Sequence, residues 1–236
     1  MENIEGEMLS EMTNDNLVKI AQTVAKVHTP EFERPGIPFR NRVEASQYDR
    51  LTEQIDFLRD WFDKLGHYIN EVSEGGNFDF EQLSEAKDAI LAKAAEARES
   101  FQDHSFSLIH FDLNSGNILK DREGNILLLD WRQASIGDRA MDIAKFFFKN
   151  NLGDRQHEIF LDVYSSELND ETLRKRIDVY TPLLRLVSLL WRLRFLNIDI
   201  KEHPEITQGV NIDLVRVRLD DDYQYLINSA KTSTNK

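Results

Sequence analysis

The chain has 236 residues, of which 41% are hydrophobic, and a formal net charge of −13. This length and apolar content suit one large domain or two small ones with a real core, and they exclude a chain that is disordered throughout. Cysteine is absent from the sequence, which excludes a disulfide scaffold and thiolate metal sites. The acidic balance, with no dense basic cluster, argues against nucleic acid as a partner.

The sequence shows neither a membrane span nor a secretory signal. No apolar run approaches the ~18 residues that a transmembrane helix needs. The first seven residues are acidic where a signal peptide is basic. We therefore expect a cytoplasmic chain with no membrane partner.

The first hundred residues read as helices. After Thr13-Asn14-Asp15, a natural cap, apolar residues at helical spacing predict a helix as far as His28. Three prolines between residues 30 and 38 predict an extended loop. Two further helices are expected, over about Ser46–Val72 and Phe80–Ser100.

The pattern changes to short strands at residue 105. Residues 105–110 alternate in hydropathy as a strand does. Residues 118–120 and 126–129 are short apolar runs on either side of a turn-like segment, Asp121–Asn125. We expect these two runs to pair as a β-hairpin.

Helical patterns resume near Asp138 and continue to the end. They predict a long helix over Leu173–Phe195, broken or kinked near Pro182, and a last helix from about Pro204 to Ala230. The expected fold class is α+β and mostly helical, with a small β-hairpin set inside a helical body.

The hairpin register brings polar side chains together. If Lys120 pairs with Ile126, Asn117 and Asp130 converge at the open end of the hairpin, beside the loop that holds Asp112. Two carboxylates and an amide oxygen are the hard ligands that Mg²⁺ accepts while it keeps waters and substrate phosphates. The pattern is typical of a phosphoryl-transfer site.

Three segments carry a family resemblance: His-Phe-Asp-Leu-Asn-Ser-Gly-Asn at 110–117, Leu-Asp-Trp at 129–131, and Gly-Asp-Arg-Ala-Met-Asp-Ile-Ala at 137–144. They resemble the catalytic and metal-binding loops of the protein-kinase fold. They are closer to the branch of aminoglycoside phosphotransferases and choline kinases, which Trp131 also favours because protein kinases carry Phe-Gly there. The resemblance implies transfer from ATP, with Mg²⁺, to a hydroxyl of an aminoglycoside, choline or a related aminoalcohol.

The resemblance also implies roles for individual residues. Asp112 would be the catalytic base, and Asn117 and Asp130 would hold Mg²⁺. His110 would pin the catalytic loop, and Asp142 would brace it from the following helix.

The segment Ile4-Glu5-Gly6 looks like the hinge that meets adenine in these kinases, and only three residues precede it. None of the ten glycines belongs to a Gly-x-Gly-x-x-Gly motif or precedes a lysine. The sequence therefore reads as the carboxy-terminal lobe of a protein-kinase-like fold, with the amino-terminal lobe absent. Two alternatives stay open: a non-catalytic binding or regulatory module derived from such a kinase, and an incomplete fragment of a full-length kinase.

The expected organisation treats residues 1–236 as one such lobe. Its parts are a hinge-like segment at 1–9, a helical substrate wall at 30–104, a catalytic and metal-binding core at 105–148, and a helical remainder at 149–236. The −13 charge favours a cationic acceptor, and the face left by the missing lobe favours self-association or a partner chain.

Other groups have ordinary structural interpretations. The histidines outside the catalytic motif show no metal-ligand spacing, so core or surface roles are expected for them. Phe146–Phe148 is expected in the core, and Asp220–Asp222 on a solvated surface.

Overall fold

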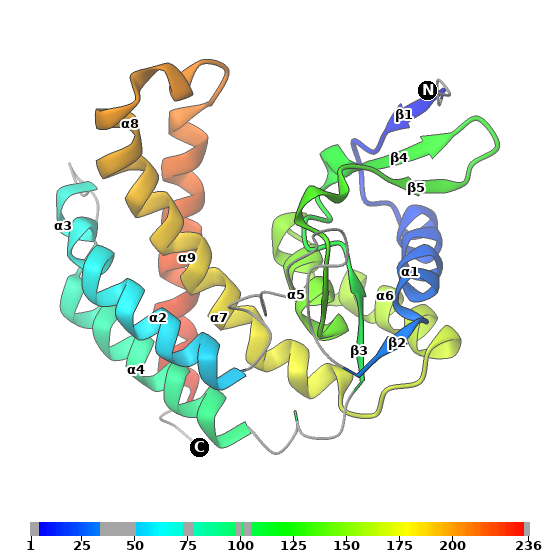
Figure 1. The fold of residues 1–236 in the computed structure, drawn as a ribbon, viewed down its shortest axis with the longest axis horizontal. Coiled ribbons are helices and arrows are strands. Elements are labelled where there is room, and N and C mark those ends of the chain that lie inside the picture. The colour runs from blue at the N-terminus through cyan, green and yellow to red at the C-terminus, as the bar shows by residue number, and fades with distance from the viewer. Residues whose placement is uncertain (1–4, 34–50, 73–77, 98–100, 102–104, 234–236) are drawn as a thin grey trace. The chain divides into compact units, whose positions relative to one another are not determined.

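A computed structural model describes residues 5–33, 51–72, 78–97, 101 and 105–233 (Figure 1). The chain divides into two compact units: residues 1–49 with 100–181, and residues 50–99 with 182–236. The range 30–104, proposed from the sequence as one helical wall, is thus shared between the two units.

The first unit is built around helix α1 (Asn14–His28), which packs against α6 (Asp154–Glu167). Helix α1 begins where the sequence predicts, because the Thr13 hydroxyl accepts a hydrogen bond from the backbone N–H of Asn16 at 3.3 Å. Helix α5 (Arg139–Lys149) is capped in the same way by Asp138.

The first sheet of this unit has the strand order β1-β4-β5 and contains the predicted hairpin. Strands β4 (Ile118–Asp121) and β5 (Ile126–Leu128) pair antiparallel with Lys120 opposite Ile126, which confirms the expected register. Strand β1 (Gly6–Met8) was not predicted, because three residues are too few to show a period. Gly6 is required there: a Cβ would collide with the Leu119 side chain and the Lys120 carbonyl.

The second sheet has the order β2-β3-β6, formed by β2 (Glu31–Phe32), β3 (Phe106–Ile109) and β6 (Ser135–Gly137). All pairings are antiparallel. The central strand β3 is the one predicted over 105–110. Its last residue leads directly into the catalytic motif, so this sheet sets where that motif starts.

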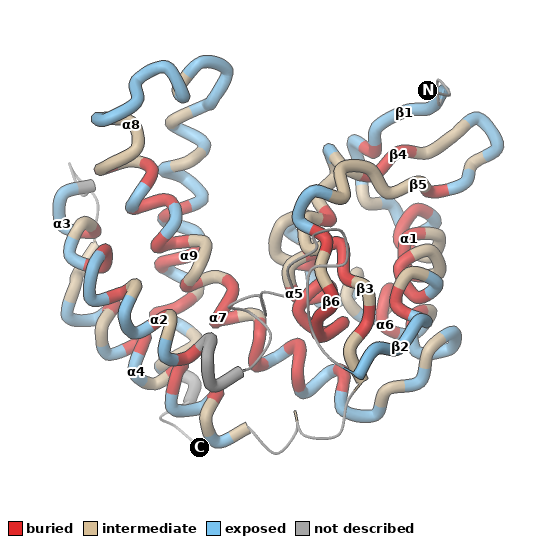
Figure 2. Tube along the Cα trace, viewed as in Figure 1, coloured by how far each residue is buried: buried red, intermediate tan, exposed pale blue. Residues whose placement is uncertain are grey.

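Buried residues line the helix faces that meet the sheets (Figure 2). Phe146 and Phe147 of α5 are buried, and Phe146 packs on Phe160 of α6 with ring centroids 5.1 Å apart. Phe148 is only half-buried, so two of the three phenylalanines belong to the core.

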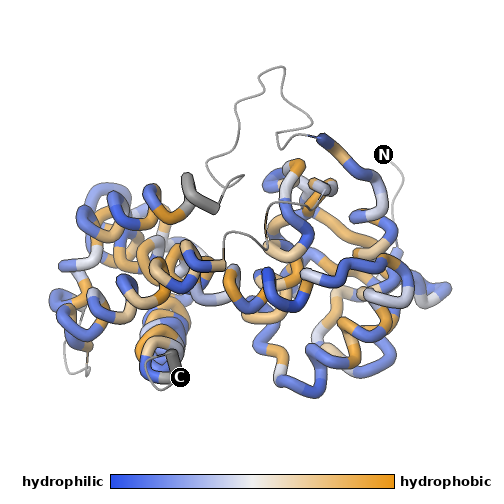
Figure 3. The backbone as a smooth tube through the Cα atoms, turned by 90° about the horizontal axis from the view of Figure 1, so that it is seen from below, coloured by the Kyte–Doolittle hydropathy of each residue, from blue (hydrophilic) through white to orange (hydrophobic). Residues whose placement is uncertain are grey.

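The second unit contains helices and connecting turns, with no strand among its described residues. Its elements are α2 (Leu51–Leu65), the 3₁₀ turn η1 (Gly66–Tyr68), α3 (Ile69–Val72), α4 (Phe80–Glu96), the later part of α7 (Leu173–Arg194), the π-helical turn η5 (Phe195–Asp199), α8 (Ile200–Glu202), the 3₁₀ turn η6 (Pro204–Thr207) and α9 (Ile212–Ser233). Hydrophobic and hydrophilic residues alternate along these helices, as amphipathic packing requires (Figure 3).

Three of the predicted helices differ in the structure. The helix expected over about Ser46–Val72 is divided after Leu65 by the 3₁₀ turn η1. Helix α7 continues through Pro182 without a break, although the boundary between the two units falls there. The last helix begins at Ile212 rather than near Pro204, because a separate 3₁₀ turn and Gly209, at φ +79°, precede it.

Asp222 corrects the expectation of a solvated acidic cluster. Its side chain is buried and accepts hydrogen bonds from Arg185, at 3.0 Å, and from Arg192. Burial raises the pKa of Asp222, and the two guanidiniums oppose that rise. The acidic run therefore includes a buried ion-pair partner, which its sequence neighbours do not reveal.

In the described part of the chain, no helix has the length and apolar character needed to cross a lipid bilayer.

Candidate active site

The catalytic motif follows β3 as a tight loop held by His110. The His110 ring accepts a hydrogen bond at Nδ1 from the backbone N–H of Asp112, at 3.2 Å, and donates from Nε2 to the carbonyl of Leu129, at 2.7 Å. Phe111 takes a positive φ of 60° between them, an uncommon conformation for a bulky side chain. The loop is thus tied both to itself and to the end of the hairpin.

The side-chain carboxylate of Asp142 also holds this loop. Its Oδ2 accepts from the backbone N–H of His110 and its Oδ1 from that of Phe111, each at 2.8 Å. Burial opposes ionisation of this carboxyl, but the hydrogen bonds from His28 and from the backbone outweigh it, so its pKa lies below its ordinary value. These are the contacts that the bracing role predicted for Asp142 would require.

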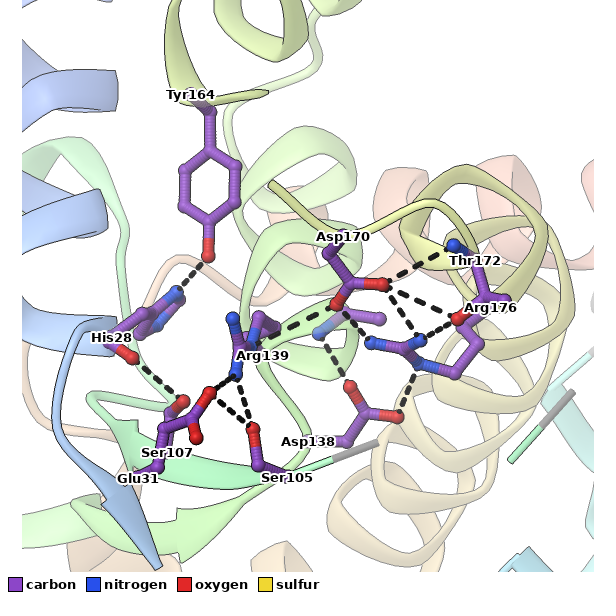
Figure 4. A network of polar contacts seen from close by, with 11 residues as sticks. His28, Glu31, Ser105, Ser107, Asp138, Arg139, Tyr164, Asp170, Thr172 and Arg176 are labelled. Atoms are coloured by element: carbon purple, nitrogen blue, oxygen red, sulfur yellow. Dashed lines mark hydrogen bonds and ion pairs between the residues drawn. The ribbon is translucent and has the colours of Figure 1, made fainter. Parts of the chain in front are cut away.

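His28 completes this support, and the sequence did not single it out. Its Nε2 lies 3.2 Å from Asp142 Oδ2. Its Nδ1 lies 2.9 Å from the hydroxyl of Tyr164, a contact that Figure 4 shows. A proton on Nε2 satisfies both contacts, since the ring then donates to Asp142 and accepts from Tyr164. The one sequence signal is its position at the end of the apolar stripe of α1, and the structure buries it fully.

Asp112 and Asn117 are joined directly. The Asn117 amide donates from Nδ2 to the Asp112 carbonyl at 2.8 Å and to Asp112 Oδ2 at 3.0 Å. Asn117 Oδ1 has no hydrogen-bond partner among the described residues and can accept a ligand. The backbone carbonyl of Asn117 accepts from Leu129 N–H at 2.8 Å, which places Asn117 next to the segment that carries Asp130.

Asp130 sits in a left-handed turn directly after β5, at φ 60° and ψ 68°. Arg132 binds both of its oxygens, from Nε to Oδ1 and from Nη2 to Oδ2, each at 2.6 Å. This contact lowers the pKa of Asp130 and raises that of Arg132. The sequence-based interpretation did not consider Arg132, although its position two residues after Asp130 was visible.

The donor set fits Mg²⁺. Asn117 and Asp130 offer amide and carboxylate oxygens from adjacent segments, and Asn117 Oδ1 is free of other contacts among the described residues. The described residues form no cluster of three or more His, Cys, Asp or Glu side chains that could enclose a metal. A site with few protein ligands is what Mg²⁺ uses when phosphates and waters complete its shell.

Lys145 of α5 is a further residue that contacts the loop. Its ammonium donates to the Phe111 carbonyl at 2.6 Å and lies 3.9 Å from the centroid of the Phe111 ring. Burial lowers the pKa of Lys145 to about 8, and Asp112 and Asp142 oppose that shift. The sequence shows only that Lys145 lies three residues after Asp142 on the same predicted helix. That spacing does not reveal its contact with Phe111.

A second polar network anchors the start of α5. The buried Arg176 donates to Asp138 at 2.9 Å and to Asp170 at 2.7 Å, and Arg139 lies 3.9 Å from Asp170 (Figure 4). Asp138 therefore caps α5 and anchors it at the same time. The helix that carries Asp142 and Lys145 is fixed at its first residue.

The hinge-like residues lie at the other end of the first sheet. Ile4 falls outside the described residues. Glu5 is exposed and forms an ion pair with Arg122. Gly6 is opposite Asp121, the residue of β4 that is farthest along the strand from Asn117.

The model of the family described as "Phosphotransferase enzyme family" matches residues 15–176. Solved structures share the fold at low identity. The choline kinase LicA from Streptococcus pneumoniae is 18% identical with a TM-score of 0.61, over 98% of this chain and 69% of that one. A choline/ethanolamine kinase family protein from Mesorhizobium loti is 16% identical with a TM-score of 0.59, over 98% and 66%.

The GDP complex of a wild-type aminoglycoside 2'-phosphotransferase-IIIa is 15% identical with a TM-score of 0.57, over 94% of this chain and 69% of that one. This chain thus spans about two thirds of the length of these structures. A search of curated proteins gave no significant match. The fold is a mostly helical α+β fold similar to those of these kinases, and because the family model covers well over half of it, the chain belongs to the phosphotransferase enzyme family.

Proposed function

We propose that this chain carries the catalytic and metal-binding part of a phosphotransferase that moves the γ-phosphoryl group of ATP to a hydroxyl of a small molecule. One observation carries the proposal. The braced loop brings Asp112 into contact with Asn117, and the hairpin sets Asn117 beside the segment of Asp130.

In this proposal, each residue has a separate task. Asp112 accepts the proton of the acceptor hydroxyl, and the Asn117 amide keeps that carboxylate oriented. Asn117 Oδ1 and Asp130 hold Mg²⁺, whose charge, when it is bound, offsets the negative charge of the transferred phosphoryl group. His110 and Asp142 keep the loop in place without touching substrate.

We also propose that the chain corresponds to the carboxy-terminal lobe of a kinase-like fold. The nucleotide base would then lie near residues 1–9, where the resemblance assigns Ile4, Glu5 and Gly6 to the hinge. The catalytic core would be 105–148, with acceptor-contacting walls from 30–104 and further helices from 149–236. The fold likeness to nucleotide-bound relatives supports this arrangement.

The proposed acceptor is a small, cationic hydroxyl compound. The net charge of −13 favours a cation, and the fold neighbours include proteins described as choline, ethanolamine and aminoglycoside kinases. Acceptor affinity should fall as salt rises, because added ions screen the attraction between opposite charges. Salt-independent binding of a neutral sugar would contradict this part of the proposal.

The test is phosphoryl transfer from radiolabelled ATP to a panel of choline, ethanolamine and aminoglycosides. The wild-type chain should label one class of acceptor only in the presence of Mg²⁺, and Asp112→Asn should abolish labelling. Asp162→Asn serves as the matched control, since it changes an exposed carboxylate of the same unit outside the site. Nucleotide binding without transfer to any acceptor would favour a non-catalytic binding module instead.

A further inference from the structure

The metal carboxylate of the proposed site already has a cationic partner within the chain. The guanidinium of Arg132 grips both oxygens of Asp130 through two parallel hydrogen bonds of 2.6 Å. Of the cations that the structure describes, Arg132 is the one that forms an ion pair with Asp130. Any divalent cation that binds Asp130 must therefore compete with Arg132.

This partner can leave without disturbing the fold. The side chain of Arg132 is 87% exposed, whereas Asp142 has buried partners in the His28 side chain and the His110 backbone amide. Exposed ion pairs contribute little to stability, because water and salt screen them and both side chains lose freedom when they pair. The contact is also local, since Asp130 and Arg132 are only two positions apart in the turn.

The chemistry of the contact indicates where the guanidinium would go. A planar guanidinium presents the same fork to a carboxylate and to a phosphate, and it binds either with two parallel hydrogen bonds. Nucleotide phosphates bound through a cation at Asn117 and Asp130 would lie within the neighbourhood of Arg132. In such an exchange Arg132 would leave the carboxylate of Asp130 and pair with a phosphate, while the divalent cation would take its place at Asp130. Every charged group would keep an opposite charge beside it.

We propose that Arg132 is a phosphate-binding residue that exchanges partners: it neutralises Asp130 in the free chain and transfers to the nucleotide phosphates when a divalent cation takes Asp130. This inference rests on the proposed function, because it requires Asp130 to be a metal ligand. It adds a residue that couples cation binding to nucleotide binding. Because such coupling is reciprocal, each ligand strengthens the binding of the other.

Isothermal titration of two probes tests the exchange: Mn²⁺ alone, and a non-hydrolysable ATP analogue in the presence of Mg²⁺. Arg132→Ala should bind Mn²⁺ alone roughly 2- to 5-fold more tightly, because the competitor is gone. The same variant should bind the analogue about 10-fold more weakly, because a charge-assisted contact to phosphate is lost. These opposite changes are the signature of the exchange.

Two further variants test whether these changes in affinity come from the position of Arg132, its charge or the shape of its guanidinium. Arg174→Ala removes another exposed arginine that is paired with a carboxylate in the same unit, changes the net charge equally, and should alter neither affinity. Arg132→Lys keeps the charge without the fork, so it should pair less well with both Asp130 and phosphate, and both affinities should lie between those of wild type and Arg132→Ala.

The outcomes distinguish the two proposals. If Asp130→Asn loses cation-dependent binding while Arg132→Ala equals wild type with both probes, the exchange is wrong and the metal site stands. If Asp130→Asn binds both probes as wild type does, Asp130 is not a metal ligand and both proposals fall. Thermal unfolding of each variant, expected at the wild-type midpoint, verifies that binding changes are local.

Discussion

The catalytic loop and the turn after β5 meet at one end of the hairpin, yet they are held in opposite ways. The loop that contains Asp112 is fixed by the buried carboxylate of Asp142, which has His28 behind it. The turn that contains Asp130 is held by the exposed Arg132. The comparison teaches that buried contacts hold one segment in a single conformation, whereas an exposed ion pair leaves the other segment able to exchange its partner.

The largest expected effect comes from removing the buried brace. Asp142→Ala leaves two backbone N–H groups and His28 without their acceptor in the core, so we expect a loss of about 3–5 kcal/mol in the free energy of unfolding. Urea denaturation measures it. Asp142→Asn keeps the shape and should lose less; a loss below about 1 kcal/mol for Asp142→Ala would show that the loop does not depend on this brace.

The next effect separates the roles of the two carboxylates in the site. Asp112→Asn should lower turnover at least about 100-fold, as expected when a general base is lost, with nearly unchanged affinity for Mg-nucleotide. Asp130→Asn should weaken that affinity itself, because it removes a proposed cation ligand. Titration of both variants with Mg-nucleotide decides between the roles, and equal affinities would contradict the assignment.

A smaller effect concerns Lys145, which contacts the loop of Asp112, and the pH dependence of the free energy of unfolding. The pKa of Lys145 falls from 10.5 to about 8 on folding, so between these values the unfolded chain holds the extra proton and stability rises with pH. The stability of wild type relative to Lys145→Met should therefore increase by about 1 kcal/mol from pH 7 to pH 9. Denaturation at the two pH values measures this, and a difference that stays flat or falls would mean that the Lys145 ammonium is not desolvated in the folded chain.

The smallest expected effect is that of removing Arg132, the exposed partner of Asp130, on stability. Arg132→Ala should leave the thermal midpoint of unfolding unchanged, because its ion pair with Asp130 is screened by water. The same scan at low and high salt should give the same answer. A clear loss of stability would mean that Arg132 is part of the fold, and the two regions would then not differ as described.

Much of the site could be predicted from local sequence. The register that sets Asn117 near Asp130 follows from two apolar runs and the turn between them, and the structure pairs Lys120 with Ile126 accordingly. The cap of α5 at Asp138 and the position of Asp142 one turn later also follow from short-range rules. The roles of Asp112, Asn117 and Asp130 remain predictions.

The features that the sequence did not reveal depend on contacts between distant residues. His28 and Tyr164 lie 136 positions apart, so no period along the chain links them. Asp222 reads as one of three surface carboxylates until Arg185 and Arg192 approach it from α7. A buried ion pair has no local signature, since each partner has the sequence context of an exposed charge.

By itself, the sequence determined the helices with clear apolar stripes, the hairpin and the catalytic motif, because capping, periodicity and strand pairing act over a few residues. Only the tertiary structure decided which polar groups are buried and paired: the support of Asp142 by His28, the lowered pKa of Lys145, and the hold of Arg132 on Asp130. The physical reason is that burial and electrostatic pairing depend on distance in space, which a linear pattern does not contain.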